Sequence, residues 1–360
     1  FSLLFFALST AMDFRHHGNA FTKYLFGLIV SVLIFKIFLI LFLLVEDFMR
    51  LGKVGYNKVA DGDLDMSRSS FFNKIAVGVG GLPFVAFLYG MAKSAYDYQV
   101  NHIVVKLPNL PAGFEGLKIV QISDIHSGSF TRTEPLIKAV AQINALKPDL
   151  FFFTGDLVND LATEIEPYID IFKTIESKYG NFSITGNHDY SDYMKWDSAT
   201  EKMANFKALV DSHQKMGWKI LLNENHIIEN EAGEKLAIIG IENWGVRFAQ
   251  YGKLHKAIQG SEVAPVRILL SHDPSHWDAE VRKKYPEIDL ALAGHTHGFQ
   301  MGVETKYFRF SPVQWVYKQW AGLYKEDHQY LYVNRGFGFI GFPGRVGILP
   351  EIAVIELQRG

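Results

Sequence analysis

Cysteine is absent from the 360 residues of the chain. Its absence excludes disulfides, thiolate nucleophiles and cysteine-ligated zinc. Any metal site must therefore use His, Asp, Glu or Asn, and these ligands favour harder divalent ions such as Mn, Fe, Zn or Mg. The net charge is also small, at −2, and the sequence contains no basic run of the kind that binds along a phosphate backbone. The sequence therefore indicates no nucleic-acid partner.

Apolar residues are abundant, at 48% of the chain, and the longest apolar runs lie near the N-terminus. Residues 24–45 carry one charge, Lys36, and are long enough to cross a bilayer. Residues 75–92 are predicted to be a second span, because membrane helices tolerate their glycines and proline. Residues 1–12 are too short to span and are interpreted as the end of a truncated first span or of a processed segment. Residues 1–92 are thus predicted to form a multi-pass region in the cytoplasmic (inner) membrane.

The orientation of this region is predicted from basic residues in the loops. Only Arg15 and Lys23 precede the first full span, whereas the following loop contains Arg50, Lys53, Lys58, Arg68 and Lys74. The excess places residues 46–74 in the cytoplasm, so the rest of the chain is predicted to be extracytoplasmic. If residues 75–92 lie on the membrane without crossing it, the prediction reverses and the remainder faces the cytoplasm.

The pattern changes at about residue 116, where short apolar runs begin to alternate with amphipathic segments. Residues 117–122 are typical of a strand, and residues 133–146 have apolar side chains at helical spacing. Residues 229–233, ENEAG, are typical of a hairpin turn between two strands. Alternating strands and helices predict an α/β layered fold. We expect residues 93–115 to be a connector and residues 116–360 to form a single domain.

Polar side chains that can bind metals follow the predicted strands, each at a carboxyl end. They are Asp124, His126, Asp156, Asn187, His188, Asp189, His272, His295 and His297. In an open α/β sheet, that edge is where ligands bind. Taken singly, each has an ordinary structural explanation, such as a turn aspartate, a core histidine or a helix cap. Their joint occurrence at successive strand ends favours a metal site.

The order of these motifs, Asp-x-His, Gly-Asp, Gly-Asn-His-Asp, His and Gly-His-x-His, resembles that of the calcineurin-like metallophosphoesterases. The resemblance covers residues 116–360 and includes all five blocks. The forms SDIHSG and AGHTHG, and the C-terminal segment from Asn334, resemble the membrane-associated bacterial branch of that superfamily.

The resemblance implies a four-layer α-β-β-α sandwich that holds two divalent metal ions, Mn, Fe or Zn, with Mg as a further candidate. It implies that the first ion is held by Asp124, His126, Asp156 and His297. The second would be held by Asp156, Asn187, His272 and His295, with Asp156 bridging the two. His188 would act as a general acid or electrostatic stabiliser beside the leaving group, and Asp189 would orient it.

Two such ions, about 3.5–4 Å apart, clamp a phosphoryl group and lower the pKa of a bound water, so that hydroxide can attack phosphorus in line. We therefore predict a membrane-anchored metallophosphoesterase that hydrolyses a phosphoester or pyrophosphate. The spans favour a lipid-linked substrate and contact with membrane lipids. Some relatives cleave the pyrophosphate of UDP-diacylglucosamine. That reaction requires a cytoplasmic active site, and the basic residues of the loops argue against a cytoplasmic site in this chain.

Two alternatives remain open: a phosphodiesterase or nucleotidase for soluble substrates, and an inactive metal-binding receptor or scaffold. Arg335 and Arg345, in the glycine-rich C-terminal segment, are candidates for a bidentate clamp on a substrate phosphate. Residues 313–324 are rich in aromatics and are interpreted either as a flap toward lipid or as an insertion packed on the sheet.

Overall fold

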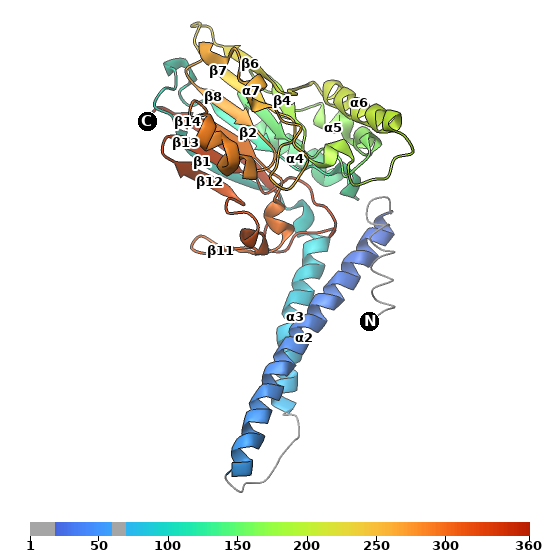
Figure 1. Ribbon diagram of the computed structural model, residues 1–360. Coiled ribbons are helices and arrows are strands. Elements are labelled where there is room, and N and C mark those ends of the chain that lie inside the picture. The colour runs from blue at the N-terminus through green and yellow to red at the C-terminus, as the bar shows by residue number, and fades with distance from the viewer. Residues whose placement is uncertain (1–18, 60–69) are drawn as a thin grey trace. The chain divides into compact units, whose positions relative to one another are not determined.

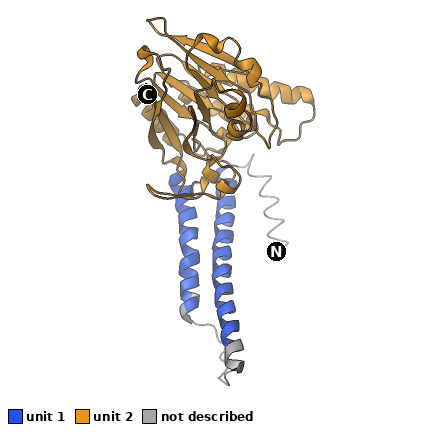
Figure 2. Cartoon of the chain, turned by 60° about the vertical axis from the view of Figure 1, so that its left-hand side comes forward, with its two compact units in different colours: residues 1–94, 342–346 blue, residues 95–341, 347–360 orange. Residues whose placement is uncertain are grey.

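The computed structural model describes residues 19–59 and 70–360. The chain divides into two compact units, coloured separately in Figure 2. One unit contains the N-terminal helices together with residues 342–346, and the other contains residues 95–341 and 347–360. Each unit is described by itself below.

The first unit consists mainly of two long helices, α2 (Ala20–Val59) and α3 (Ser70–Ala92), which run side by side (Figure 1). The Phe35 and Phe84 rings meet edge to face, 6.2 Å apart, between them. Both helices are long and apolar enough to cross a membrane. Large apolar side chains, such as Phe48 and Leu82, are exposed along them, as expected for helices surrounded by lipid. Both helices extend beyond the predicted spans, and the expected partial span at residues 1–12 lies outside the described residues.

The second unit contains two six-stranded sheets. The first sheet has the order β1 (Gln99–Lys106), β14 (Glu351–Gln358), β2 (Lys118–Ile122), β3 (Leu150–Thr154), β4 (Asn181–Ile184) and β5 (Trp218–Ile220). Strands β2 to β5 are parallel, and β14 is antiparallel to β2. The carboxyl ends of β2, β3 and β4 therefore share one edge.

The second sheet has the order β12 (Gly322–Glu326), β13 (Gln329–Val333), β9 (Leu290–Ala293), β8 (Arg267–Leu270), β7 (Lys235–Gly240) and β6 (Glu224–Glu229). Strands β13, β9, β8 and β7 are parallel, and the outer strands β12 and β6 are antiparallel to their neighbours. A separate small hairpin is formed by β10 (Val303–Glu304) and β11 (Arg309–Phe310).

Three hydrophobic clusters show how the layers pack. One lies between the sheets, where Phe152 of the first sheet packs with Ile268 of the second. Another lies between the first sheet and helices α4 (Glu134–Ala145), α5 (Ile169–Phe172) and α6 (Ala199–Lys215). The third lies on the outer face of the second sheet and includes residues of α7 (Leu254–Ala257) and the π-helical turn η7 (Trp277–Val281), which α8 (Arg282–Lys284) continues. The unit is therefore a four-layer α-β-β-α sandwich, and the predicted fold class is confirmed.

Two local expectations differ from the structure. Residues 93–115, expected to be a connector, contain β1, which pairs along its full length with β14 as an edge strand. Residues 165–175 have apolar side chains at helical spacing, which predicts one helix, but they form a 3₁₀ segment, η4 (Ala162–Tyr168), followed by the single turn of α5. Pro167 has no backbone N–H and cannot sustain a longer α-helix there. The hairpin predicted at residues 229–233 is confirmed between β6 and β7.

Candidate metal centre

The predicted metal-binding residues converge where the carboxyl ends of the two sheets meet. Asp124 and His126 follow β2, Asp156 follows β3, and His272 follows β8. A hydrogen bond of 2.7 Å from His272 Nδ1 to the carbonyl oxygen of Thr154 joins the two sheet edges. This bond places a proton on Nδ1, so that Nε2 is the ring nitrogen of His272 that faces the site.

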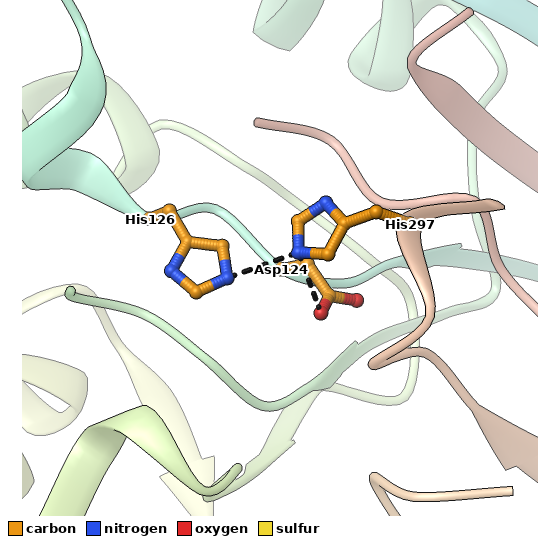
Figure 3. Close-up of side chains that lie close together, drawn as sticks. All are labelled: Asp124, His126 and His297. Atoms are coloured by element: carbon orange, nitrogen blue, oxygen red, sulfur yellow. Dashed lines mark hydrogen bonds and ion pairs between the residues drawn. The ribbon is translucent and has the colours of Figure 1, made fainter. Parts of the chain in front are cut away.

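Asp124, His126 and His297 form the first cluster (Figure 3). His297 Nε2 lies 3.2 Å from Asp124 Oδ1 and 3.0 Å from His126 Nε2. All three side chains are buried. Two imidazole nitrogens at this separation need a proton or a cation between their lone pairs, so the arrangement fits a metal ion.

Asp156, His272 and His295 form the second cluster, and in each cluster the ligand atoms lie within 4.8 Å of one another. Asp156 Oδ2 is 3.1 Å from His272 Nε2 and 3.5 Å from His126 Nε2. One carboxylate thus contacts both clusters. Asn187 joins the second cluster, because its Oδ1 lies 2.8 Å from His295 Nδ1.

The remaining polar atoms of these ligands are held by residues around them. Asn187 Nδ2 donates to the Tyr193 hydroxyl at 2.8 Å. His295 Nε2 lies 2.8 Å from the hydroxyl of Tyr317, which donates to Asp273 Oδ2 at 3.2 Å. Hydrogen bonds of this kind orient metal ligands and set their tautomers.

The backbone of the ligand loops is unusual. Five of the candidate ligands have positive φ angles, and they are Asp124 (54°), His126 (46°), Asp156 (61°), His295 (70°) and His297 (51°). Such angles are uncommon for residues other than glycine and occur at functional sites. Gly294 helps the loops to converge, because a Cβ there would collide with Ser123 and Asp124.

Electrostatics keep the carboxylates ready to bind cations. Burial raises the pKa of Asp124, but His297 and His272 outweigh it and lower the pKa overall. Burial lowers the pKa of His272, but Asp156 and Asp124 reverse the effect and raise it to about 10. The site therefore attracts positive charge strongly, as a cavity for divalent ions must.

His188 lies beside the first cluster, with its ring 4.9 Å from that of His126. The prediction that Asp189 orients His188 is wrong. His188 Nδ1 donates to the carbonyl oxygen of Asn159 at 2.8 Å. Asp189 is buried and accepts from the backbone N–H groups of Asp156, Leu157 and Gly186 at 2.8–2.9 Å. Its carboxylate holds the ligand loops together and makes no bond to the histidine ring.

The predicted arginine clamp is also wrong. Arg335 pairs with Glu304, at 2.8 Å from Nε to Oε2, and with Glu351, at 3.1 Å from Nη1 to Oε2. Arg345 is fully buried and has no exposed surface to offer a phosphate. The Arg335 side chain is thus engaged by two carboxylates, and the Arg345 side chain is enclosed by protein.

Sequence reasoning missed several residues at the site, namely Asn159, Tyr193, Asp273 and Tyr317. Asp273 directly follows His272 and Asn159 lies three residues after Asp156, where Asn159 acts through its backbone carbonyl. Tyr317 lies in the aromatic segment 313–324, and Phe248 also contacts the site, with its ring 4.7 Å from that of His295. The sequence signal for Tyr317 was the aromatic content of that segment, which is unusually high for a solvent-exposed loop.

Comparisons with known proteins agree with this geometry. A family model described as "Calcineurin-like phosphoesterase" matches residues 117–299. A second, described as "Probable Calcineurin-like phosphoesterase, transmembrane domain", matches residues 1–95.

Relatives occur in animals and bacteria. The chain is 28% identical to a transmembrane protein with metallophosphoesterase domain from Danio rerio, over 76% of this chain and 61% of that protein. It is 28% identical to the metallophosphoesterase YkuE of Bacillus subtilis, over 81% of this chain and 98% of that protein.

A third relative has a named substrate. The chain is 26% identical to the UDP-2,3-diacylglucosamine pyrophosphatase LpxG of Chlamydia muridarum, over 65% of this chain and 81% of that protein. With its four-layer sandwich, its two clusters of buried carboxylates and imidazoles and its matching transmembrane region, the chain belongs to the calcineurin-like phosphoesterase family.

Proposed function

We propose that the chain is a membrane-anchored phosphohydrolase that uses two divalent metal ions. The observation that carries the proposal is the position of Asp156, whose Oδ2 lies within 3.5 Å of a histidine nitrogen in each cluster. One shared carboxylate is what two ions held close together require. When bound, two such ions would stabilise charge on the phosphoryl oxygens and supply an acidified water.

We assign the ligands accordingly. Asp124, His126 and His297 would hold the first ion, and Asn187, His272 and His295 the second, with Asp156 shared. The neutral amide of Asn187 adds a ligand oxygen without adding negative charge, which would repel an incoming phosphate. Nitrogen and oxygen donors of this kind suit Mn, Fe or Zn.

His188 would supply the proton for the leaving group. Its Nδ1 is engaged by the Asn159 carbonyl, so Nε2 is the ring nitrogen that exchanges a proton. The backbone N–H of His188 donates to Asp156 Oδ1 at 2.9 Å, which ties the acid to the shared carboxylate. Proton transfer by a positioned group is typically worth about 10²–10⁴-fold in rate.

A lipid-linked substrate is supported by apolar side chains exposed on the loops that follow the ligands. Phe299, which is 52% exposed, lies two residues after His297, and Trp315, which is 75% exposed, lies two residues before Tyr317. Tyr307, at the turn of the β10–β11 hairpin, is 90% exposed. Aromatic side chains with polar ends favour the membrane interface. The named substrate of the LpxG relative is also a lipid.

The test is hydrolysis of an aryl phosphodiester and an aryl phosphomonoester by full-length protein in detergent, stripped of metal and refilled with Mn. Asn187→Ala is the control, because it removes one ligand of the second ion. We expect metal-dependent turnover that the variant loses. A protein that binds two ions but hydrolyses neither ester, nor any lipid phosphate, would support the inactive receptor and refute the proposal.

A further inference from the structure

A cavity lies beside the metal centre and is lined by two cations that the catalytic proposal does not use. It has a volume of about 370 Å³, within the range of small-ligand sites. Arg247 and Lys318 line it, together with Ser275 and Tyr317. Tyr317 lines the cavity and also contacts the metal centre, since its hydroxyl lies 2.8 Å from His295 Nε2. The cavity is therefore one side chain away from the proposed ligands of the second ion.

The two cations come from different loops. Arg247 lies between β7 and α7, and Lys318 follows the 3₁₀ turn η9 (Pro312–Trp315). Both are exposed, and among the described residues no carboxylate pairs with either one within 4.0 Å. Unpaired cations from separate loops on one cavity create a local positive potential in a chain whose net charge is −2.

The one carboxylate that lines the cavity is already neutralised. Asp278 Oδ1 accepts from Arg282 Nε at 2.6 Å, and its Oδ2 accepts from Gln319 Nε2 at 3.1 Å. It therefore does not compete for the two cations. The wall near Arg247 is also fixed, because the backbone N–H of Val246 donates to Ser275 Oγ at 3.0 Å.

We propose that this cavity binds a second phosphoryl group of the substrate, next to the phosphorus that is attacked, through Arg247 and Lys318. Guanidinium and ammonium groups form charge-assisted hydrogen bonds with phosphate oxygens. The inference rests on the proposed phosphohydrolase function and narrows it. Diphosphate substrates, with two adjacent phosphoryl groups, are preferred over simple esters of a single phosphate.

The test compares bis(4-nitrophenyl) phosphate with P¹,P²-bis(4-nitrophenyl) diphosphate, which differ only by the second phosphoryl group. Hydrolysis by the full chain, refilled with Mn, is followed chromatographically. We expect the Arg247→Ala/Lys318→Ala double variant to raise KM for the diphosphate by about 10-fold or more, as loss of charge-assisted bonds predicts, and KM for the monophosphate diester by less than about 2-fold. Lys256→Ala, an exposed cation on α7 outside the cavity, should change neither.

The outcomes separate the two proposals. If the unaltered protein hydrolyses both substrates and the double variant changes both KM values equally or not at all, the inference is overturned while the phosphohydrolase function stands. If the unaltered protein hydrolyses neither substrate, the result counts against the proposed phosphohydrolase function itself, on which the inference rests. Metal content, measured in parallel, should remain equal in all variants, and rescue of the diphosphate KM by Arg247→Lys/Lys318→Arg would confirm that charge is the cause.

Discussion

Replacing Asp189 with asparagine should unfold the catalytic unit more easily and leave in place the hydrogen bond from His188 Nδ1 to the Asn159 carbonyl. Each oxygen of this buried carboxylate accepts from the backbone: Oδ2 from Asp156 and Gly186 at 2.9 and 2.8 Å, and Oδ1 from Leu157 at 2.8 Å and Val158 at 3.4 Å. Asparagine keeps one oxygen and turns the other position into an NH₂ group, so two N–H donors lose their acceptor.

The magnitude follows from the cost of an unsatisfied buried donor, about 1–3 kcal/mol each, which gives about 2–6 kcal/mol for the pair. Domains are commonly stable by only about 5–15 kcal/mol, so this loss is large. For a unit of this size it corresponds to a fall in Tm of roughly 5–20 °C.

The assay is thermal unfolding of the detergent-solubilised protein, together with the pH dependence of kcat measured well below the lower Tm. Asp170→Asn, at an exposed carboxylate on α5, is the matched control and should leave Tm unchanged. A variant that unfolds at the normal temperature but has a displaced acid limb in its rate profile would refute the reasoning, because that result belongs to a carboxylate that orients His188.

Four further outcomes are expected. His188→Ala should retain both metal ions by elemental analysis and lose about 10²–10⁴-fold in kcat, and a loss of metal would show that His188 is a ligand. Tyr317→Phe should weaken metal binding by about 10–100-fold in chelator competition, because His295 loses its hydrogen-bond partner, and unchanged affinity would contradict this role. Burial lowers the pKa of His213 to about 3, so the folded state stays neutral while the unfolded state gains a proton below about pH 6.5. The free energy of unfolding should thus fall by about 2 kcal/mol from pH 7 to pH 5 because of His213. In the His213→Phe variant, measured by denaturant unfolding, this contribution to the fall should be absent. Because the chain has no cysteine, Lys207→Cys on the exposed face of α6 should be labelled by an impermeant maleimide in intact cells if the catalytic unit is extracytoplasmic, and only after lysis if it is cytoplasmic.

The sequence predicted the strand-end residues because their chemistry is local and periodic. Asp124, Asp156 and His272 each follow a short apolar run, and the carboxyl ends of parallel strands share an edge. Strand β1 escaped prediction because alternation between half-buried and exposed side chains is weak in it, and it depends on pairing with β14, more than 240 residues away along the chain.

The roles of Asp189 and Arg335 could not be read from the sequence for a different reason. Both are polar residues beside recognisable motifs, and a charged side chain can serve chemistry or packing equally well until its partners are known. The partners of Arg335 are Glu304 and Glu351, which lie 31 and 16 positions away in sequence. The Tyr317 hydroxyl contacts His295 Nε2, but the two residues are separated by a loop, and no periodic sequence pattern indicates such a contact.

The left-handed backbone at Asp124, His126, Asp156, His295 and His297 has a consequence for how ions enter and leave. Each such residue costs about 1–2 kcal/mol relative to an ordinary conformation, and the packing of the two sheets opposes that cost. An arriving ion therefore meets donors that are already in place and spends little free energy on ordering loops. The ligand loops should therefore keep their conformation when ions leave or bind, so that removal of metal by a chelator is reversible and leaves the fold intact.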